Sequence, residues 1–252
     1  MSEQTDRLIF CGRAQKIPIS MQTKNNYLAL KKFCQQQGAD LFGVADIRQV
    51  RQEFALSPKV RDKLGRAVCL GVRLSSAILE EIIDAPTRLY FHHYRTLNAL
   101  LDQLAIKTAN YIQAKGYAAL PIPASQILDW QKQTGHLAHK KIGRLAGLGW
   151  IGRNNLLVNK NFGSQFRLCT VLTNMPLPAD KPTRDNCGRC RACVVVCPAQ
   201  AIKESPAEFR RLQCLAKLKQ FQKERLAEQY ICGVCVRACA GTQPFLIGLG
   251  KR

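Results

Sequence analysis

The spacing of hydrophobic and polar residues predicts a helix followed by two strands near the start of the chain. Residues 26–37 are amphipathic with helical spacing, and Gly38 is a residue typical of helix C-termini. A short apolar run at residues 41–45 follows directly, and a second apolar run covers residues 67–74. Runs of this length predict buried strands, whereas residues 1–25 show no clear periodicity and are expected to form a loose arm.

The longest predicted helix begins near Pro86 and ends at Gly116, in keeping with the preference for proline at helix starts and glycine after helix ends. A strand at residues 117–122 is expected to follow it. Because strands and helices alternate, we expect an α/β layer over roughly residues 26–175. The core-facing stripe of the long helix carries Tyr90, Tyr94, Leu97, Leu101, Leu104 and Ile112.

The composition indicates an ordered chain with no targeting signal. The chain has 252 residues, of which 46% are hydrophobic, and this is enough to bury a core. Its N-terminus has no basic start followed by an apolar run, and no segment approaches the ~18 apolar residues of a membrane-spanning helix. We therefore expect a soluble, cytoplasmic protein with no membrane partner.

The formal net charge of +21 suggests an anionic partner. Nucleic acid, an acidic electron donor and a phosphorylated cofactor all fit a balance this basic. The lysines and arginines form no single run, so an ordinary basic surface is the alternative.

The twelve cysteines are distributed unevenly, because eight of them lie between Cys187 and Cys239 and the other four are scattered. Disulfide frameworks belong mainly to small secreted domains, so reduced, metal-binding thiols fit this chain better. Scattered cysteines suggest core filling, and crowded ones suggest ligation of a metal.

The crowded region contains the spacing C-x2-C-x2-C-x3-C-P of bacterial two-cluster ferredoxins. In that arrangement three close cysteines bind one [4Fe-4S] cluster and the fourth binds another, so eight ligands are required. Zinc is the alternative metal, but a triple run of this kind is not a zinc-knuckle pattern. We expect one cluster on Cys187, Cys190, Cys193 and Cys239, and a second on Cys197, Cys214, Cys232 and Cys235.

The predicted fold class is therefore α+β. We expect an N-terminal α/β cofactor-binding domain at residues 26–178 and a ferredoxin-like domain with two [4Fe-4S] clusters at residues 183–252. The proline-rich stretch at residues 176–182 is the expected linker. Two clusters form a path for electrons, and the upstream domain is the candidate destination.

A glycine-rich turn at residues 146–159 is the most informative upstream segment. Its glycines allow close approach of the backbone, while Trp150 offers a flat surface and Arg153 a cation. The pattern predicts a helix-to-strand turn that cradles a large cofactor or an anionic group. A structural turn around a buried tryptophan fits the same residues, but a dinucleotide fingerprint requires the opposite order of strand and helix.

In this order the motifs resemble the epoxyqueuosine reductases of tRNA modification and their shorter relatives. The resemblance runs from residues 28–45 through residues 146–159, Gly163, Ser164 and residues 176–178 into the cysteine runs. It implies cobalamin held beside the proximal cluster, a low-potential electron donor of flavodoxin or ferredoxin type, and a tRNA or other anionic substrate. In plan the chain is also similar to the corrinoid iron–sulfur reductive dehalogenases.

The resemblance also implies which residues lie against the corrin ring. Arg153 stands where the family usually has lysine, which keeps the charge. Tyr94 corresponds loosely to a family residue that approaches the cofactor, although it belongs to the apolar stripe as well. The implied cofactor-binding residues are Gly147, Gly149, Trp150, Gly152, Arg153, Asn155 and His93.

The chain departs from the family at the expected proton donor. Epoxyqueuosine reductases have an aspartate seventeen residues before the tryptophan of the turn, and Gln133 occupies that place here. An amide cannot donate a proton as a carboxylic acid does. Nearby His136 and His139 titrate near neutrality and are the candidate catalytic residues, with a solvated helix start as the structural alternative.

Three functions remain open from the sequence. The first is a corrinoid-dependent iron–sulfur reductase related to epoxyqueuosine reductase, with an unidentified substrate. The second is a ferredoxin-like electron carrier or reductase subunit without its own substrate site. The third is a nucleic-acid-binding protein with structural clusters, suggested by the charge alone. A second departure, Cys239-Ala240 in place of the family's Cys-Pro-Trp, puts regions used for tRNA contact in doubt.

Overall fold

A computed structural model describes residues 19–131 and 133–242, and its centre is a four-stranded sheet. All neighbouring strands run antiparallel, and two of the four are eight residues long. The strands follow the order β1 (Leu41–Asp46), β2 (Arg66–Arg73), β6 (Phe166–Thr173) and β3 (Ala119–Ile122).

The α/β layer expected from alternating helices and strands is corrected by this sheet. Parallel strands need a crossover connection of a dozen or more residues, usually a helix. Between β1 and β2 the chain forms only the 3-10 helix Arg51–Glu53 and α2 (Pro58–Arg61), so β2 returns beside β1 in the opposite direction. The central strand β6 comes from far along the chain, and the apolar pattern did not single it out.

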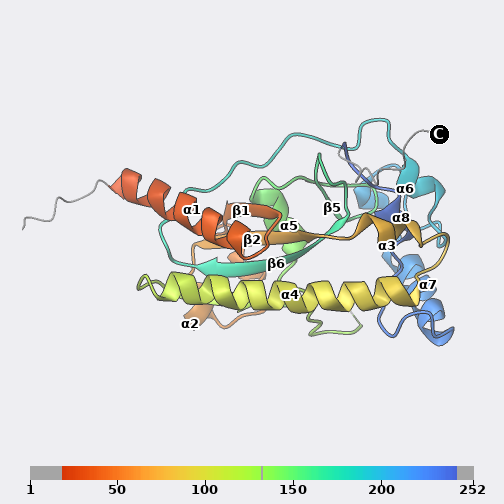
Figure 1. Ribbon diagram of the computed structural model, residues 1–252, viewed down its shortest axis with the longest axis horizontal. Coiled ribbons are helices and arrows are strands. Elements are labelled where there is room, and N and C mark those ends of the chain that lie inside the picture. The colour runs from red at the N-terminus through yellow and green to blue at the C-terminus, as the bar shows by residue number, and fades with distance from the viewer. Residues whose placement is uncertain (1–18, 132, 243–252) are drawn as a thin grey trace, which may run out of the picture.

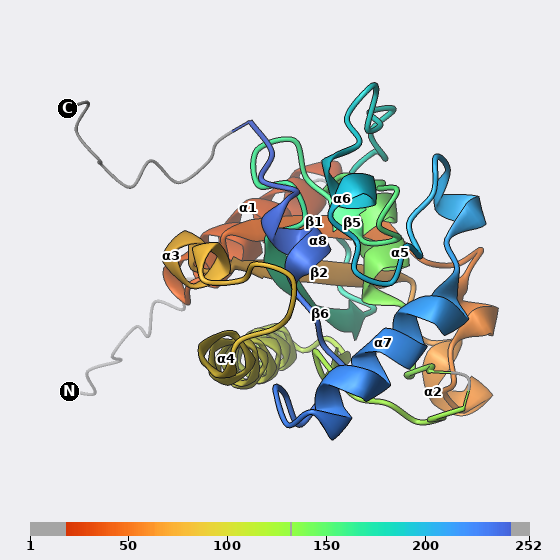
Figure 2. The same ribbon diagram turned by 90° about the vertical axis from the view of Figure 1, so that its right-hand side faces the viewer.

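Helices cover both faces of the sheet (Figures 1 and 2). On one face, α1 (Ile19–Gln36) and α4 (Arg88–Gln113) pack over Val68 and Leu70. On the other face, α5 (His139–Leu145) packs over Ala67 and Cys69. Successive residues of β2 thus enter different cores, as the two-residue period of a strand requires.

Two predicted helix boundaries differ from the structure. Helix α1 begins at Ile19 rather than at residue 26, so it extends into the segment expected to be a loose arm. Helix α4 begins at Arg88, where the hydroxyl of Thr87 accepts a hydrogen bond from the backbone of Tyr90 at 3.0 Å. Residues 1–18, the rest of the predicted arm, lie outside the described part of the chain.

The C-terminal segment packs against the sheet and α4 rather than apart from them. Ala227, Ile231 and Val234 belong to the same hydrophobic core as the long helix. Its helices are α6 (Ala192–Val195), the 3-10 helix Pro206–Glu208, α7 (Arg211–Lys223) and α8 (Val234–Arg237), and α8 contacts α3 (Ser76–Glu80).

A two-stranded hairpin lies between the sheet region and the C-terminal segment, and it contacts the C-terminal segment through Trp150 and Arg153. It consists of β4 (Trp150–Ile151) and β5 (Leu157–Val158), and it follows α5 directly. The predicted order of helix, glycine-rich turn and strand is therefore confirmed. Within the described residues, no helix is both long and apolar enough to cross a membrane.

Candidate functional site

The eight crowded cysteines fall into two groups of four in space. Burial raises the pKa of Cys193 to about 11, and the neighbouring thiols Cys239, Cys187 and Cys190 raise it further in that order. These four are called the first cysteine group below.

The second cysteine group consists of Cys197, Cys214, Cys232 and Cys235. Burial raises the pKa of Cys235 well above that of a free thiol, and the other three members of the group add to this effect. Cys193 of the first group also acts on Cys235, so the two groups are neighbours. Their members are the same as those of the two ligand sets expected from the motif spacing.

The donor set suits an iron–sulfur cluster better than a single ion. Among the described residues, no three His, Cys, Asp or Glu side chains are placed so that they could together hold one metal ion. Four thiolates on one tetrahedral zinc must all lie about 2.3 Å from it, whereas a [4Fe-4S] core spreads them over the corners of a larger cube. Ligation of clusters by these cysteines stays a prediction.

Hydrogen-bond donors surround both cysteine groups. The indole Nε1 of Trp150 donates to Sγ of Cys187, and the backbone N–H of Ala201 donates to Sγ of Cys197, each at 3.4 Å. Ser164 hydrogen-bonds to Cys239 and partly offsets the rise that burial causes in the pKa of that thiol. Such N–H and O–H donors stabilise the negative charge that thiolate ligands carry.

The glycines of the 146–159 turn serve the packing of the chain itself. Gly147 has a φ of +70°, and a Cβ there would lie 2.6 Å from the carbonyl oxygen of Lys181. A Cβ at Gly149 would overlap the carbonyl of Val158. A Cβ at Gly152 would lie 2.5 Å from Cγ2 of Val158, so this glycine lets the two strands of the hairpin pack closely.

Arg153 and Asn155 take different roles in the same hairpin. The guanidinium of Arg153 donates to the backbone carbonyls of Cys190 and Gly188, both at 2.9 Å, and so braces the loop that carries the first cysteine group. Asn155 accepts hydrogen bonds from Nζ of Lys140 at its backbone carbonyl, 2.8 Å, and at its side-chain oxygen, 2.9 Å. Of the turn residues expected at a corrin ring, Asn155 faces a cavity while Trp150 and Arg153 contact the cysteine loop.

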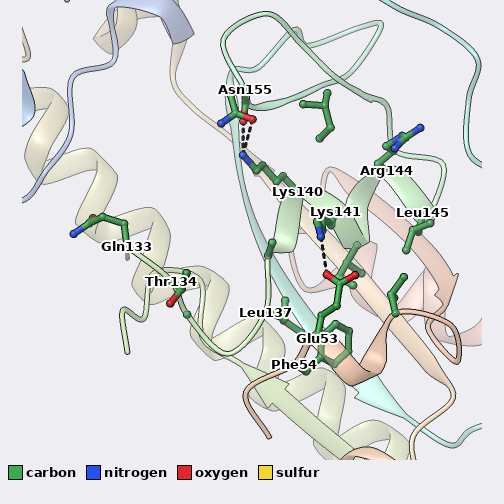
Figure 3. A pocket seen from close by; sticks show the side chains of 15 residues that line it. Glu53, Phe54, Gln133, Thr134, Leu137, Lys140, Lys141, Arg144, Leu145 and Asn155 are labelled. Atoms are coloured by element: carbon green, nitrogen blue, oxygen red, sulfur yellow. Dashed lines mark hydrogen bonds and ion pairs between the residues drawn. The ribbon is translucent and has the colours of Figure 1, made fainter. Parts of the chain in front are cut away.

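A cavity of about 620 Å³ lies between α5, the hairpin and the segment after β1 (Figure 3). Its cations come from α5, and Nζ of Lys141 pairs with Glu53 at 2.6 Å. Glu53 is the one acidic residue among the described residues that line it. The polar lining consists of Glu53, Gln133, Thr134, Lys140, Lys141, Arg144 and Asn155.

Two further cavities of about 290 Å³ each adjoin the same lysine. All four cysteines of the second group line one of them, together with Tyr94 and Asn155. Lys140 lines all three cavities. Burial lowers the pKa of this lysine, and the charge of Lys141 lowers it further. The second cysteine group therefore lines a cavity that shares Lys140 and Asn155 with the cationic cavity, whereas the first group lines none of the three cavities.

Lys140 was not singled out by the sequence. The hairpin brings Asn155 back over α5, where it accepts hydrogen bonds from Lys140. A lysine in a run of two at a helix start is otherwise typical of a solvated face. The pairing of α5 with the hairpin loop is a tertiary contact, and no local pattern marks it.

The two predicted proton donors occupy different surroundings. Nε2 of His139 lies 2.9 Å from the carbonyl of Pro123 and must donate to it, so Nδ1 accepts from the hydroxyl of Thr170 at 2.8 Å. Burial lowers the pKa of His139 to about 4, which leaves the ring neutral near pH 7. His136 has a buried Nδ1 with no hydrogen-bond partner among the described residues and is absent from the lining of the large cavity, whereas Gln133 lines it.

His93 is engaged in the fold. Its Nε2 accepts a hydrogen bond from the backbone N–H of Ser75 at 3.0 Å and so fixes the start of α3. Burial lowers the pKa of this histidine, which favours the neutral ring that accepts this bond. Neighbouring Tyr94, in contrast, lines the cavity of the second cysteine group.

Curated proteins similar in sequence are epoxyqueuosine reductases. The enzyme of Leadbetterella byssophila is 35% identical over 103 residues, which cover 37% of this chain and 33% of that protein. The enzyme of Yersinia pestis is 42% identical over 82 residues, which cover 32% of this chain and 20% of that protein. Over these segments the chain is similar to the epoxyqueuosine reductases. The resemblance inferred from the motifs is confirmed, although the matched segment spans a third or less of each relative.

Solved structures show the same fold. A reductive dehalogenase described as B12-dependent superposes with a TM-score of 0.68 at 18% identity, over 90% of this chain and 33% of that one. An epoxyqueuosine reductase bound to a tRNA-Tyr stem loop modified with epoxyqueuosine gives a TM-score of 0.60 at 18% identity, over 84% of this chain and 64% of that one. A search against models of protein families gives no match.

Proposed function

We propose that this relative of the epoxyqueuosine reductases is an iron–sulfur reductase that delivers electrons through two [4Fe-4S] clusters to a cobalamin in the cationic cavity. One observation carries the proposal. The second cysteine group lines a cavity together with Lys140 and Asn155, and Lys140 lines the 620 Å³ cavity as well. A cluster on the second group would then have a destination for its electrons inside the same chain.

The residues present fit the two clusters. Each set supplies four thiols and no histidine, as [4Fe-4S] clusters require, and each receives a donor on a cysteine sulfur. Gly163 approaches the backbone of Cys239 so closely that a Cβ there would overlap its carbonyl. This contact brings the last cysteine of the run back to the first three.

The cavity fits a large anionic cofactor or substrate. Its lining is mainly apolar with a few cationic and amide groups, which is typical of cofactor sites. Lys140 and Asn155, which line it, and Tyr94, which lines the adjoining cavity, are the residues proposed to hold cobalamin. When bound, cobalamin would supply the low-potential reductant for breaking a polarised C–O or C–X bond. The roles expected at the corrin for Gly147, Gly149, Trp150, Gly152, Arg153 and His93 stay predictions.

Lys140 is the proposed source of the proton. Its pKa is lowered by burial, which brings an ammonium closer to the range in which it donates a proton at neutral pH. It also lies at the junction of the cavities, where His136 is absent from the lining. The catalytic roles predicted for His136 and His139 are less well supported by this geometry.

The proposed substrate is a modified nucleoside within RNA. The net charge of +21 favours a polyanion, and α7 carries Lys217, Lys219 and Lys223, of which Lys217 lines the cavity of the second group. Trp130, 64% exposed, lies edge-on to Tyr230 with ring centroids 6.1 Å apart, and Tyr230 lines that cavity. Exposed aromatic rings beside basic residues suit the stacking of an unpaired base.

A ferredoxin-like electron carrier is the second candidate function. Gln133 in place of the family aspartate favours it, because Gln133 lines the large cavity and offers no acidic proton there. A carrier would bind both clusters but neither cobalamin nor a nucleoside.

Anaerobic reconstitution separates these functions. We expect about eight irons per chain, an absorbance band near 400 nm that bleaches on reduction, and a cob(II)alamin signal in electron paramagnetic resonance that changes when Lys140→Met removes one of the cations of the cavity. Clusters without cobalamin binding at tens of micromolar would favour the carrier, and zinc in place of iron would refute both. With a tRNA stem loop carrying epoxyqueuosine, Gln133→Asp should raise turnover by about tenfold or more, because it supplies the missing acid.

A further inference from the structure

We propose that the surface around Cys190 and α6 is where an acidic one-electron carrier docks, so that electrons enter through the first cysteine group and leave through the second. The inference rests on the proposed function, because it requires clusters on both groups. The two groups differ in access to solvent. Cys190 of the first group is exposed, whereas the cysteines of the second group are partly buried and line the inner cavity.

An apolar contact point lies next to the exposed cysteine. Val195, at the end of α6, is 82% exposed, and the following Val196 is 40% exposed. Cys193 on the same short helix is buried, so the helix turns its thiol inward and its valines outward. Single exposed apolar residues are ordinary, but two adjacent ones beside an exposed cluster ligand are a suitable centre for a small interface.

The charge beside this point is basic. Arg189 and Arg191 flank Cys190 directly in the chain, and both are exposed. Nη2 of Arg191 pairs with Glu204 at 2.9 Å, and this pair lies at the surface, where it is easily exchanged for a partner's carboxylate. A basic rim around an apolar centre steers and orients an acidic partner.

The loop is held rigid in a way that suits a transient complex. Arg153 fixes the carbonyls of Gly188 and Cys190, and Trp150 donates to Cys187. Figure 2 shows α6 beside α8, which it contacts and which packs into the main core. A preorganised surface loses little freedom on binding, so a small electron-transfer interface gains enough affinity to form and still dissociates quickly.

The step itself transfers one electron and breaks no bond. The reduced carrier, a low-potential protein such as a flavodoxin or an acidic ferredoxin, is oxidised by one electron. The core on the first group is reduced from the 2+ to the 1+ state, and then passes the electron to the second core. No proton moves in this step.

The test uses the anaerobically prepared holoprotein and reduced flavodoxin. Val195→Asp and Arg189→Glu place negative charge on the proposed surface, and stopped-flow absorbance near 400 nm follows cluster reduction. We expect the second-order rate to fall about tenfold in each, and the affinity for oxidised flavodoxin in calorimetry to fall in parallel. Val60→Asp and Lys59→Glu are the matched controls on exposed positions of α2, and we expect less than twofold change in them.

Excess dithionite measures whether the clusters of each variant are intact. Equal bleaching with dithionite together with slow reduction by flavodoxin only in Val195→Asp and Arg189→Glu would support the docking site. Wild-type rates in both variants, or equal losses in the α2 controls, would overturn the docking site alone. A wild-type chain with no bleachable band would overturn the proposed function and the docking site with it.

Discussion

The first and second cysteine groups have the same chemistry and opposite surroundings. The first includes the exposed Cys190 and is braced from outside by Trp150 and Arg153 of the hairpin. The second includes the partly buried Cys235 on α8, which lines a cavity and packs against the core of the sheet and the long helix. Two groups of four cysteines can thus differ in function because of their surroundings. One group is accessible at the surface and the other lines a cavity, and this difference gives the proposed electron transfer its direction.

We expect the largest effect from removing one predicted ligand from each cysteine group. Cys235→Ala and Cys190→Ala each remove one predicted ligand, so iron should fall from about eight to about four per chain in both. Stability should differ, because Cys235 packs against the core and its loss should cost about 2 kcal/mol, while loss of the exposed Cys190 should cost about 1 kcal/mol or less. Iron analysis with urea unfolding measures both, and equal losses of stability would show that the two groups are not different in this way.

A second prediction concerns His139 and the dependence of folding stability on pH. The pKa of His139 is about 4 in the folded chain and 6.5 in the unfolded chain, so the folded ring stays neutral where the unfolded ring binds a proton. The stability that this provides is complete above pH 6.5 and is lost as the pH falls toward 4, with an upper bound of about 3 kcal/mol because the residue is partly exposed.

His139→Gln tests this support, because an amide can still donate to the carbonyl of Pro123 and does not titrate. Urea unfolding at pH 7 and pH 4.5 should show a steeper loss for the wild type than for the variant. Parallel losses would mean that other groups cause the acid sensitivity.

We expect the smallest effect from removing a single hydrogen bond to a sulfur of the first cysteine group. Trp150→Phe keeps the ring packing and removes the N–H that donates to Cys187. The first cluster should become harder to reduce by the equivalent of about 1 kcal/mol, because a thiolate without its donor is richer in charge, and the second cluster should not change. Potentiometric titration resolves the two, with Trp130→Phe as the same substitution at an exposed position. A shift of both potentials would contradict the assignment.

Much of the fold could be predicted from local patterns. The strand at residues 41–45 and the strand at residues 67–74 are present as β1 and β2 within a residue or so, and the long helix is present as α4. These elements have strong apolar spacing and clear ends. The order of the strands could not be predicted, because β6 comes from far along the chain and lies between β2 and β3.

The candidate site divides in the same way. The membership of the two cysteine groups followed from spacing, because cysteines separated by two or three residues can turn toward a common point. The residues that surround each group could not be predicted from spacing. Arg153 was expected at a cofactor and instead holds the cysteine loop, and Lys140 was passed over although it lies where the cavities meet.

By itself, then, the sequence determined many of the helices and strands, the grouping of the thiols and the similarity to the epoxyqueuosine reductases. These features depend on neighbours along the chain or on the order of motifs. Only the tertiary structure decided which cysteine group reaches solvent, which lines the cavity, and which cation lies beside it. Burial and charge at those places come from segments such as Asn155 and α8, which folding brings together from distant parts of the chain.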